Sequence, residues 1–117
     1  MQKQNEKDLK FKNVDSGTKY FVNGPKWEGG LLVLKPGQKL GEHFHREVEE
    51  TFYFLQGKGK FIGNGKEFDI ISGDIFRMEP GETHDIVNNS DIDIKVMFIK
   101  CPYIPSDKVM TNTAVSK

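Results

Sequence analysis

The sequence predicts an all-β fold, and three observations lead to this prediction. Alanine, the best helix former, occurs once among the 117 residues, at Ala114. Val and Ile together number 17 and Phe numbers 9, and these residue types suit a pleated, half-buried surface. No segment repeats its apolar residues with the helical period of about 3.6, whereas 12 glycines divide the chain into short segments. We therefore expect strands throughout and no helix longer than a turn.

Nine short strands are expected, separated by turn residues. They cover residues 19–22, 31–34, 42–46, 50–55, 60–63, 67–71, 75–78, 83–88 and 92–99. The Asn64-Gly65 pair lies between two of these strands and is a strong signal for a two-residue hairpin turn. Strands separated by turn signals roughly every 8 to 12 residues are typical of a sandwich or a barrel. Pro102 and Pro105 are expected to end the regular pairing.

Length and charge limit the possible classes of protein. A chain of 117 residues and 13.4 kDa fits a single domain with one core, which we assign to residues 1–117. Loose polar termini are expected at about residues 1–10 and 108–117. The 17 basic residues balance the 17 acidic ones, which argues against nucleic-acid binding. The longest apolar runs are too short to span a membrane, so no membrane partner is expected.

The cysteine content and the N-terminus indicate the compartment. Cys101 is the single cysteine, so an internal disulfide is excluded. The polar N-terminal segment lacks the apolar stretch of a signal peptide, and a reducing cytoplasm is therefore the expected location. Cys101 also has no neighbour that would activate its thiol, so we expect a structural or incidental role for it.

The three histidines of the chain form a pattern that favours metal binding. His43 and His45 are separated by one residue in a strand, so both side chains point to the same face. Glu50 follows on the next strand, and His84 lies in a later one. Three imidazoles and a carboxylate suit one divalent ion of Fe, Mn, Ni, Zn or Cu. The alternative is an incidental surface pair, or core histidines that are satisfied by hydrogen bonds.

The glycine framework around these residues resembles the cupin superfamily. The first cupin motif, G-x5-H-x-H-x4-E-x6-G, matches at every position. Its residues here are Gly37, His43, His45, Glu50 and Gly57. The second motif, G-x5-P-x-G-x2-H-x3-N, matches at Gly73, Gly81, His84 and Asn88. The motif proline is replaced by Glu79, with Pro80 one position later, which places a charge near the barrel rim.

This resemblance implies the fold, the metal site and an oligomeric state. A small single-domain cupin is a jelly-roll barrel, also called a double-stranded β-helix, and holds one metal ion inside. The implied metal ligands are His43, His45, Glu50 and His84. Proteins of this kind often pair as homodimers. Apolar residues on both faces of 31–34 and 96–99 also favour a homodimer, because one barrel interior cannot bury both faces.

Strand parity predicts which residues accompany the ligands. Phe52 and Phe54 share the parity of Glu50, and Ile86 shares that of His84, so all three are expected to line the pocket. The alternative for these three is plain core packing. Parity alone does not choose between Glu49 and Glu50, because the strand is apolar on both faces. Glu50 lies seven positions before Gly57 and shares a face with Phe52 and Phe54, so Glu49 is expected to point outward.

Three further residues complete the expectations. Asp85 has the opposite parity to His84 and is not expected to be a ligand. Asn88 is expected to tie a strand end. Trp27 fits an interface or rim position as well as a substrate-stacking role.

Two functional hypotheses follow from the site. The first is a metalloenzyme, of dioxygenase or isomerase type, whose metal holds adjacent oxygens of a small oxygen-rich organic molecule. The second is a non-catalytic module that binds or senses a small ligand. The barrel supports many chemistries, so the motifs do not decide whether the chain is an enzyme.

Overall fold

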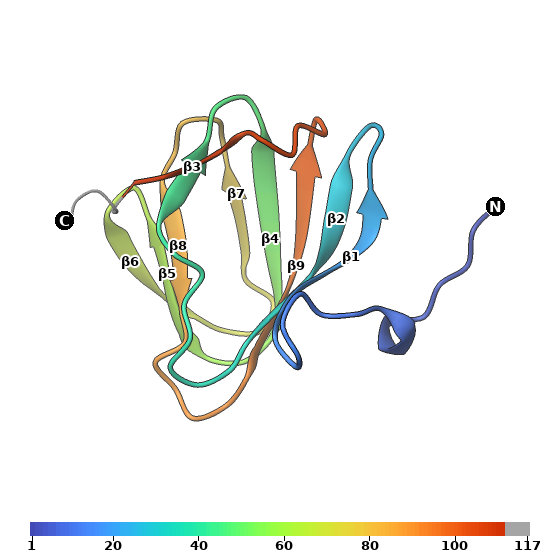
Figure 1. The fold of residues 1–117 in the computed structure, drawn as a ribbon. Helices are drawn as coiled ribbons and strands as arrows, with labels where there is room; N and C mark the ends of the chain where they lie inside the picture. Colours follow the sequence, from blue (N-terminus) through green and yellow to red (C-terminus); the bar gives the residue numbers. More distant parts are fainter. Residues whose placement is uncertain (112–117) are drawn as a thin grey trace.

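Two antiparallel five-stranded sheets face each other and form a barrel (Figure 1). The structure is a computed structural model that describes residues 1–111. Sheet A has the strand order β1-β2-β9-β4-β7, and sheet B the order β10-β3-β8-β5-β6. The strands are β1 (Gly17–Asn23), β2 (Glu28–Leu34), β3 (His43–His45), β4 (Glu49–Gln56), β5 (Gly59–Gly63), β6 (Lys66–Ile70), β7 (Ile75–Met78), β8 (His84–Val87), β9 (Ile94–Cys101) and β10 (Lys108–Met110). The predicted all-β jelly-roll fold is confirmed.

Each of the nine predicted strands is present, with ends that shift by a few residues. The hairpin between β5 and β6 turns at Asn64 and Gly65, whose φ angles of 52° and 81° are both positive. Positive φ at both central residues is the geometry of a type I′ turn, which asparagine followed by glycine adopts readily. No helix within residues 1–111 is long and apolar enough to cross a membrane.

The C-terminal segment corrects one prediction. Residues 108–110 were expected to be loose, but they form β10, which pairs with β3 at the edge of sheet B. The irregular segment after Pro102 crosses from sheet A to sheet B, so the prolines interrupt the pairing without ending it. The buried Asp107 side chain fixes this crossing, because its Oδ2 accepts hydrogen bonds from the Glu47 and Val48 N–H groups at 2.8 and 2.9 Å. Residues 112–117 lie outside the described part of the chain.

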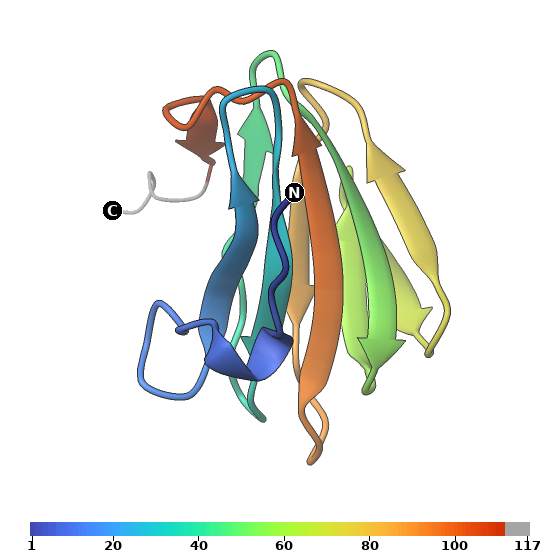
Figure 2. The same cartoon turned by 90° about the vertical axis from the view of Figure 1, so that its right-hand side faces the viewer.

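The N-terminal segment is also more ordered than expected. It contains a 3-10 helix, η1 (Glu6–Asp8), that lies against the outer face of sheet A (Figure 2). Glu6 forms ion pairs with Lys19 on β1 and Lys95 on β9, the two strands that flank β2. Every residue of β2 is buried, including Leu31 and Val33. The chain itself therefore covers apolar surface that the homodimer prediction had assigned to a partner.

The core fills one end of the barrel. Inward side chains from both sheets form a single apolar cluster, with Phe61 stacked on Phe76 at a centroid distance of 4.0 Å. Along β4 and β9 the inward residues change from apolar to charged toward the other end, where Glu50 and Lys100 are cross-strand neighbours. The barrel thus has a solid apolar end and a polar end.

Removal of the Asp107 side chain should destabilise the fold. Asp107→Ala leaves the buried Val48 N–H without a partner, so we expect a loss of about 1–3 kcal/mol in the free energy of unfolding. Asp91→Ala, at an exposed position in the loop between β8 and β9, is the matched control and should change little. Denaturant unfolding at neutral pH measures both, and equal stabilities would contradict this role for Asp107.

The contribution of Asp107 should also depend on pH. Burial raises the pKa of Asp107, but the N–H groups of Glu47 and Val48 outweigh it and lower the pKa below its ordinary value of 3.8. A lowered pKa means that the stabilisation is present above pH 3.8 and is lost as the pH falls through the folded value. The stability difference between wild type and Asp107→Ala should therefore shrink on acidification below that pH.

Candidate metal centre

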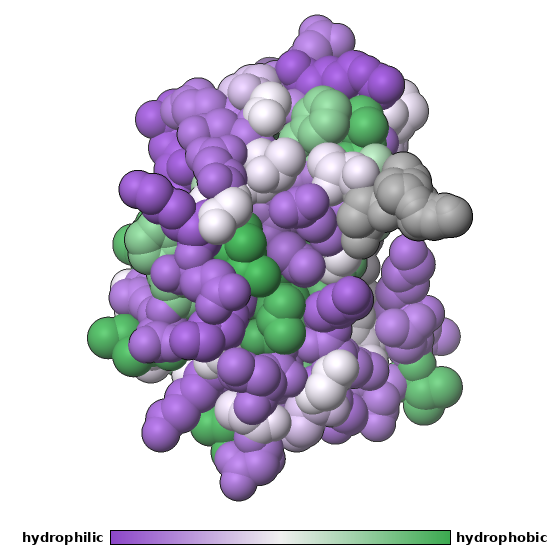
Figure 3. Space-filling model, turned by 90° about the vertical axis from the view of Figure 1, so that its left-hand side faces the viewer, coloured by the Kyte–Doolittle hydropathy of each residue, from purple (hydrophilic) through white to green (hydrophobic). Residues whose placement is uncertain are grey.

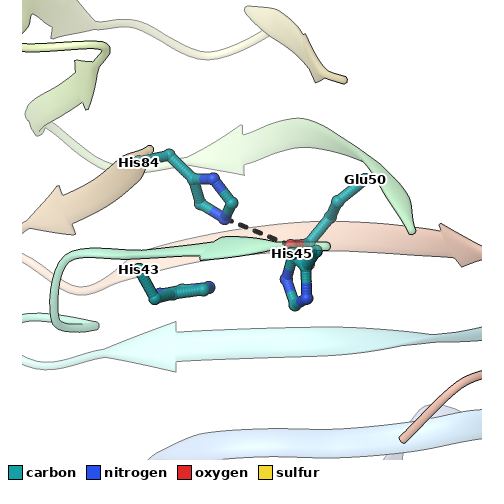
Figure 4. Close-up of side chains that lie close together, drawn as sticks. All are labelled: His43, His45, Glu50 and His84. Carbon is teal, nitrogen blue, oxygen red and sulfur yellow. Dashed lines mark hydrogen bonds and ion pairs between the residues drawn. The ribbon is translucent and has the colours of Figure 1, made fainter. Parts of the chain in front are cut away.

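Four side chains from both sheets converge at the polar end of the barrel (Figure 4). His43 and His45 point inward from β3, and His84 lies on β8 directly opposite His43. Glu50 reaches the same point from β4 in sheet A. All four residues are buried, and one nitrogen or oxygen atom of each lies within 4.8 Å of the others. The sequence-predicted residues are therefore brought together in one cluster.

Backbone carbonyls fix the orientation of two imidazoles. His43 Nδ1 donates a hydrogen bond to the Gly41 carbonyl at 2.7 Å, and His84 Nδ1 donates to the Glu82 carbonyl at 3.3 Å. A carbonyl only accepts, so each Nδ1 carries the proton and each Nε2 keeps a free lone pair. This partner arrangement is typical of metal-binding histidines, because it sets the tautomer and the direction of the ring.

Glu50 is an ionised carboxylate inside the barrel. Its Oε1 lies 3.1 Å from His45 Nε2 and 3.3 Å from His84 Nε2. Burial raises the pKa of Glu50, but the hydrogen bond from His45 and the charge of Lys100 outweigh burial and lower the pKa to about 2. Burial also lowers the pKa of His43 to about 3, against the effect of its bond to Gly41. The cluster thus offers an anionic oxygen and a neutral imidazole at neutral pH, the forms that bind metal ions.

One buried nitrogen atom lacks a hydrogen-bond partner, and this bears on whether the cluster fits a metal ion. Within residues 1–111, His84 Nε2 is the single buried side-chain polar atom without such a partner. It lies 3.3 Å from Glu50 Oε1, where its lone pair faces an anionic oxygen without a hydrogen bond between them. A buried polar atom without a partner costs free energy, and coordination to a cation at the centre of the cluster would remove that cost. The cluster is therefore consistent with one metal ion.

Aromatic rings surround the cluster on its core side. Phe52 contacts the His84 ring edge-on at 5.3 Å, and Phe61 lies parallel to the same ring at 6.4 Å. Phe52 lines the cavity beside the cluster, as its parity predicts. Phe54 and Ile86 do not border this cavity; both are fully buried in the apolar cluster. This position agrees with core packing, the alternative considered for these two residues, which lie two residues deeper along their strands than Phe52 and His84.

A cavity of about 700 Å³ leads from the cluster to the surface. Its walls come from both sheets, from the segment before β1, from the β2–β3 loop and from the segment around Tyr103. Charged cavity residues that the sequence reasoning missed include Glu28, Lys100 and Lys108. One signal was available: Lys100 shares its parity with the apolar residues Val96 and Phe98, and a charge at an inward position is unusual.

Four other residues considered in the sequence analysis lie outside both the cluster and the cavity. Glu49 points outward, as predicted, and its Oε2 accepts a hydrogen bond from Arg77 at 2.7 Å. Glu79 also lies outside, 3.2 Å from Arg77, so the charge at the motif proline position does not border the cavity. Cys101 is an exposed free thiol. Trp27 packs edge-on against Phe21 at 6.4 Å.

Asp85 and Asn88 support the site without belonging to it. Asp85 Oδ1 accepts hydrogen bonds from the N–H groups of Gly41 and Ile86, both at 2.8 Å, and so holds the residue whose carbonyl orients His43. Asn88 is fully buried, and its Nδ2 donates to the carbonyls of Leu34 and Ile92 at 2.8 Å. The predicted strand-tying role of Asn88 is confirmed.

The fold and the cluster together define a small β-barrel protein with an internal metal-type site. The chain belongs to the cupin family, because the model of the cupin domain matches residues 30–100, more than half of its length. The matched region contains all four residues of the cluster. The resemblance seen in the two sequence motifs is therefore confirmed.

Individual relatives agree with this assignment. The chain is 36% identical over 68 residues to the oxalate-binding protein of Thermotoga maritima, covering 58% of this chain and 56% of that protein. It thus spans about half the length of this relative. A Klebsiella pneumoniae protein with a double-stranded β-helix domain has a TM-score of 0.76 at 17% identity, covering 89% of this chain and 92% of that one. TT1209 of Thermus thermophilus gives 0.76 at 20% identity, covering 87% and 98%. These two structures show the fold.

The ionised state of Glu50 predicts a pH effect on the metal-free chain. A pKa of about 2, below the ordinary 4.5, means that ionisation stabilises the fold above pH 4.5 and that this contribution fades as the pH falls toward 2. Glu50→Gln mimics the protonated form. The stability of wild type relative to Glu50→Gln should therefore decrease between about pH 7 and about pH 3, measured by denaturant unfolding in the presence of a chelator. A relative stability that rises on acidification would contradict the assignment.

Proposed function

We propose that the chain binds one divalent metal ion through His43, His45, Glu50 and His84 and acts on a small oxygen-rich organic molecule. The observation that carries this proposal is the orphaned His84 Nε2 within a buried cluster that opens into a cavity. Three imidazoles and one carboxylate suit Fe, Mn, Ni, Zn or Cu in the divalent state. They leave a net positive charge on the site, which favours oxygen ligands from a bound molecule.

The residues around the cluster leave room for such a molecule on one side and exclude water on the other. A bound metal ion would supply Lewis-acid or O₂ chemistry. Phe52 shields one side of the cluster from water, and the cavity leaves the other side open for a ligand. With its low pKa, Glu50 remains a carboxylate at neutral pH and does not serve as a proton donor. The chemistry proposed is therefore of the dioxygenase or isomerase type, centred on the metal.

A non-catalytic binding module is the second candidate. The relative from Thermotoga maritima is named for binding oxalate, and its name supports binding as a function in itself. The two candidates make different predictions for turnover. Elemental analysis of anaerobically purified protein, followed by oxygen uptake with diketone and catechol candidates, separates them. Ligand binding that survives chelation, without turnover, would favour the binding module.

The metal-ligand assignment makes a prediction for two adjacent glutamates. Glu50→Ala should weaken metal affinity at least about tenfold, in the range typical of interactions lost at a metal site. Glu49→Ala removes the same side chain from the outer face and should leave the affinity nearly unchanged. Titration of both chelator-treated variants with Co²⁺ measures the difference. The reverse order of effects would overturn the assignment.

We also propose that the chain forms a homodimer through the outer face of sheet A. Tyr53, Ile75 and Ile99 are exposed there on three adjacent strands, outside the part covered by the N-terminal segment. The opposite side of the molecule, toward sheet B, is mostly hydrophilic, with an apolar strip near its centre (Figure 3). Apolar side chains on adjacent strands favour burial against a second copy.

The dimer proposal predicts a mass of about twice 13.4 kDa by light scattering at micromolar concentration. Ile75→Asp should shift the mass toward the monomer, because it places a charge in the proposed interface. Ile92→Asp is the matched control, since it changes an exposed isoleucine in the loop between β8 and β9. A monomeric wild type, or an equal effect of the two variants, would rule out this interface.

A further inference from the structure

Two lysines stand beside the metal-type cluster, one on each sheet. Lys100 on β9 is the direct cross-strand neighbour of Glu50, and Lys108 on β10 is that of His45. Cross-strand neighbours point to the same face of a sheet, so each lysine extends toward the barrel interior next to a residue of the cluster. Both lysines line the cavity.

The charges that line the cavity do not balance. Its ionisable walls contain four lysines and two glutamates, together with the imidazoles of the cluster. The residues are Lys12, Lys39, Lys100, Lys108, Glu28 and Glu50. Glu28 is engaged by Lys100 at 3.1 Å, and Glu50 by the imidazoles. The chain as a whole has no net charge, whereas the ionisable side chains of this cavity have a positive excess.

Three lysines carry this excess: Lys12, Lys39 and Lys108. Within residues 1–111 none of their ammonium groups forms an ion pair, whereas Lys100 is held by Glu28 and lies 5.4 Å from the centre of the Phe98 ring. Lys12, Lys100 and Lys108 border the same cavity, so three like charges share one enclosed space. Like charges placed together cost free energy, and a bound anion would compensate that cost.

We propose that the molecule bound in the cavity is a small organic anion, whose carboxylate or phosphate group is held by Lys108 and Lys12 while its other oxygens face the metal. This inference rests on the proposed metal-dependent function and specifies the substrate class. Lys100, fixed by Glu28, contributes positive charge beside the metal. Neither arginine of the chain lines the cavity, so the anion meets separate ammonium groups and no bidentate guanidinium. Tyr20 and Tyr103 also line the cavity and offer hydroxyl donors.

The test uses the full chain loaded with Co²⁺, whose visible spectrum reports on oxygen ligands at the metal. Oxalate and malonate are the carboxylate probes, methyl phosphate is the phosphate probe, and malonamide is the neutral counterpart of malonate. We expect at least one anion to bind and to perturb the Co²⁺ spectrum, and we expect malonamide to bind more weakly. Lys108→Met should weaken anion binding about tenfold or more, the scale of one lost charge-assisted contact. Lys108→Arg should restore most of the affinity.

Controls separate this inference from the proposed function. Lys66→Met removes a lysine on β6 that does not line the cavity, and it should leave anion affinity unchanged. Co²⁺ affinity should be no weaker in Lys108→Met than in wild type, because the substitution removes a positive charge beside the cluster. Failure of the wild type to bind Co²⁺ would overturn the metal function itself. Normal Co²⁺ binding with no anion bound, or with equal anion affinities in wild type and Lys108→Met, would overturn the anion site alone.

Discussion

The buried carboxylate of Glu50 is the constraint on which the rest of the site depends. An ionised group that is 4% exposed between two sheets requires compensation, because desolvation of an unpaired charge is very costly. The imidazole of His45 from sheet B and the ammonium group of Lys100 from sheet A supply part of it. The site therefore exists only when the two sheets are packed in their native register. A divalent ion at the centre of the cluster would complete this compensation and link the sheets through coordination.

Strand alternation explains how one barrel holds both a core and a polar cavity. Along β4 the inward residues run from Glu50 through Phe52 to Phe54, and along β9 from Lys100 through Phe98. Each step of two residues moves a side chain from the metal-type cluster toward the apolar end. Phe52 and Phe98 thus lie between the cavity and the apolar core and border both. This gradient explains why Phe52 borders the cavity and Phe54 does not.

The parts of the structure that depend on local sequence patterns were predictable from the sequence. The alternation around His43 and His45, the separation of Glu49 from Glu50 and the Asn64-Gly65 turn all follow from neighbouring residues and strand geometry. Long-range pairing could not be derived in this way. The position of Lys108 beside His45 depends on β10, three residues that follow two prolines and carry no strong strand signal. The course of η1 across β2 depends on ion pairs made by Glu6 with residues far along the chain.

Anomalous diffraction from crystals grown with Co²⁺ would test the central claim most directly, because it locates the ion without relying on activity. Data collected at the cobalt edge should give one strong peak per chain, between the imidazoles of His43, His45 and His84 and the carboxylate of Glu50. The distances from the ion to these ligand atoms should be close to those of ordinary coordination bonds, roughly 2.0–2.2 Å. A cluster that stays empty at saturating Co²⁺, or a peak at surface carboxylates only, would contradict the account.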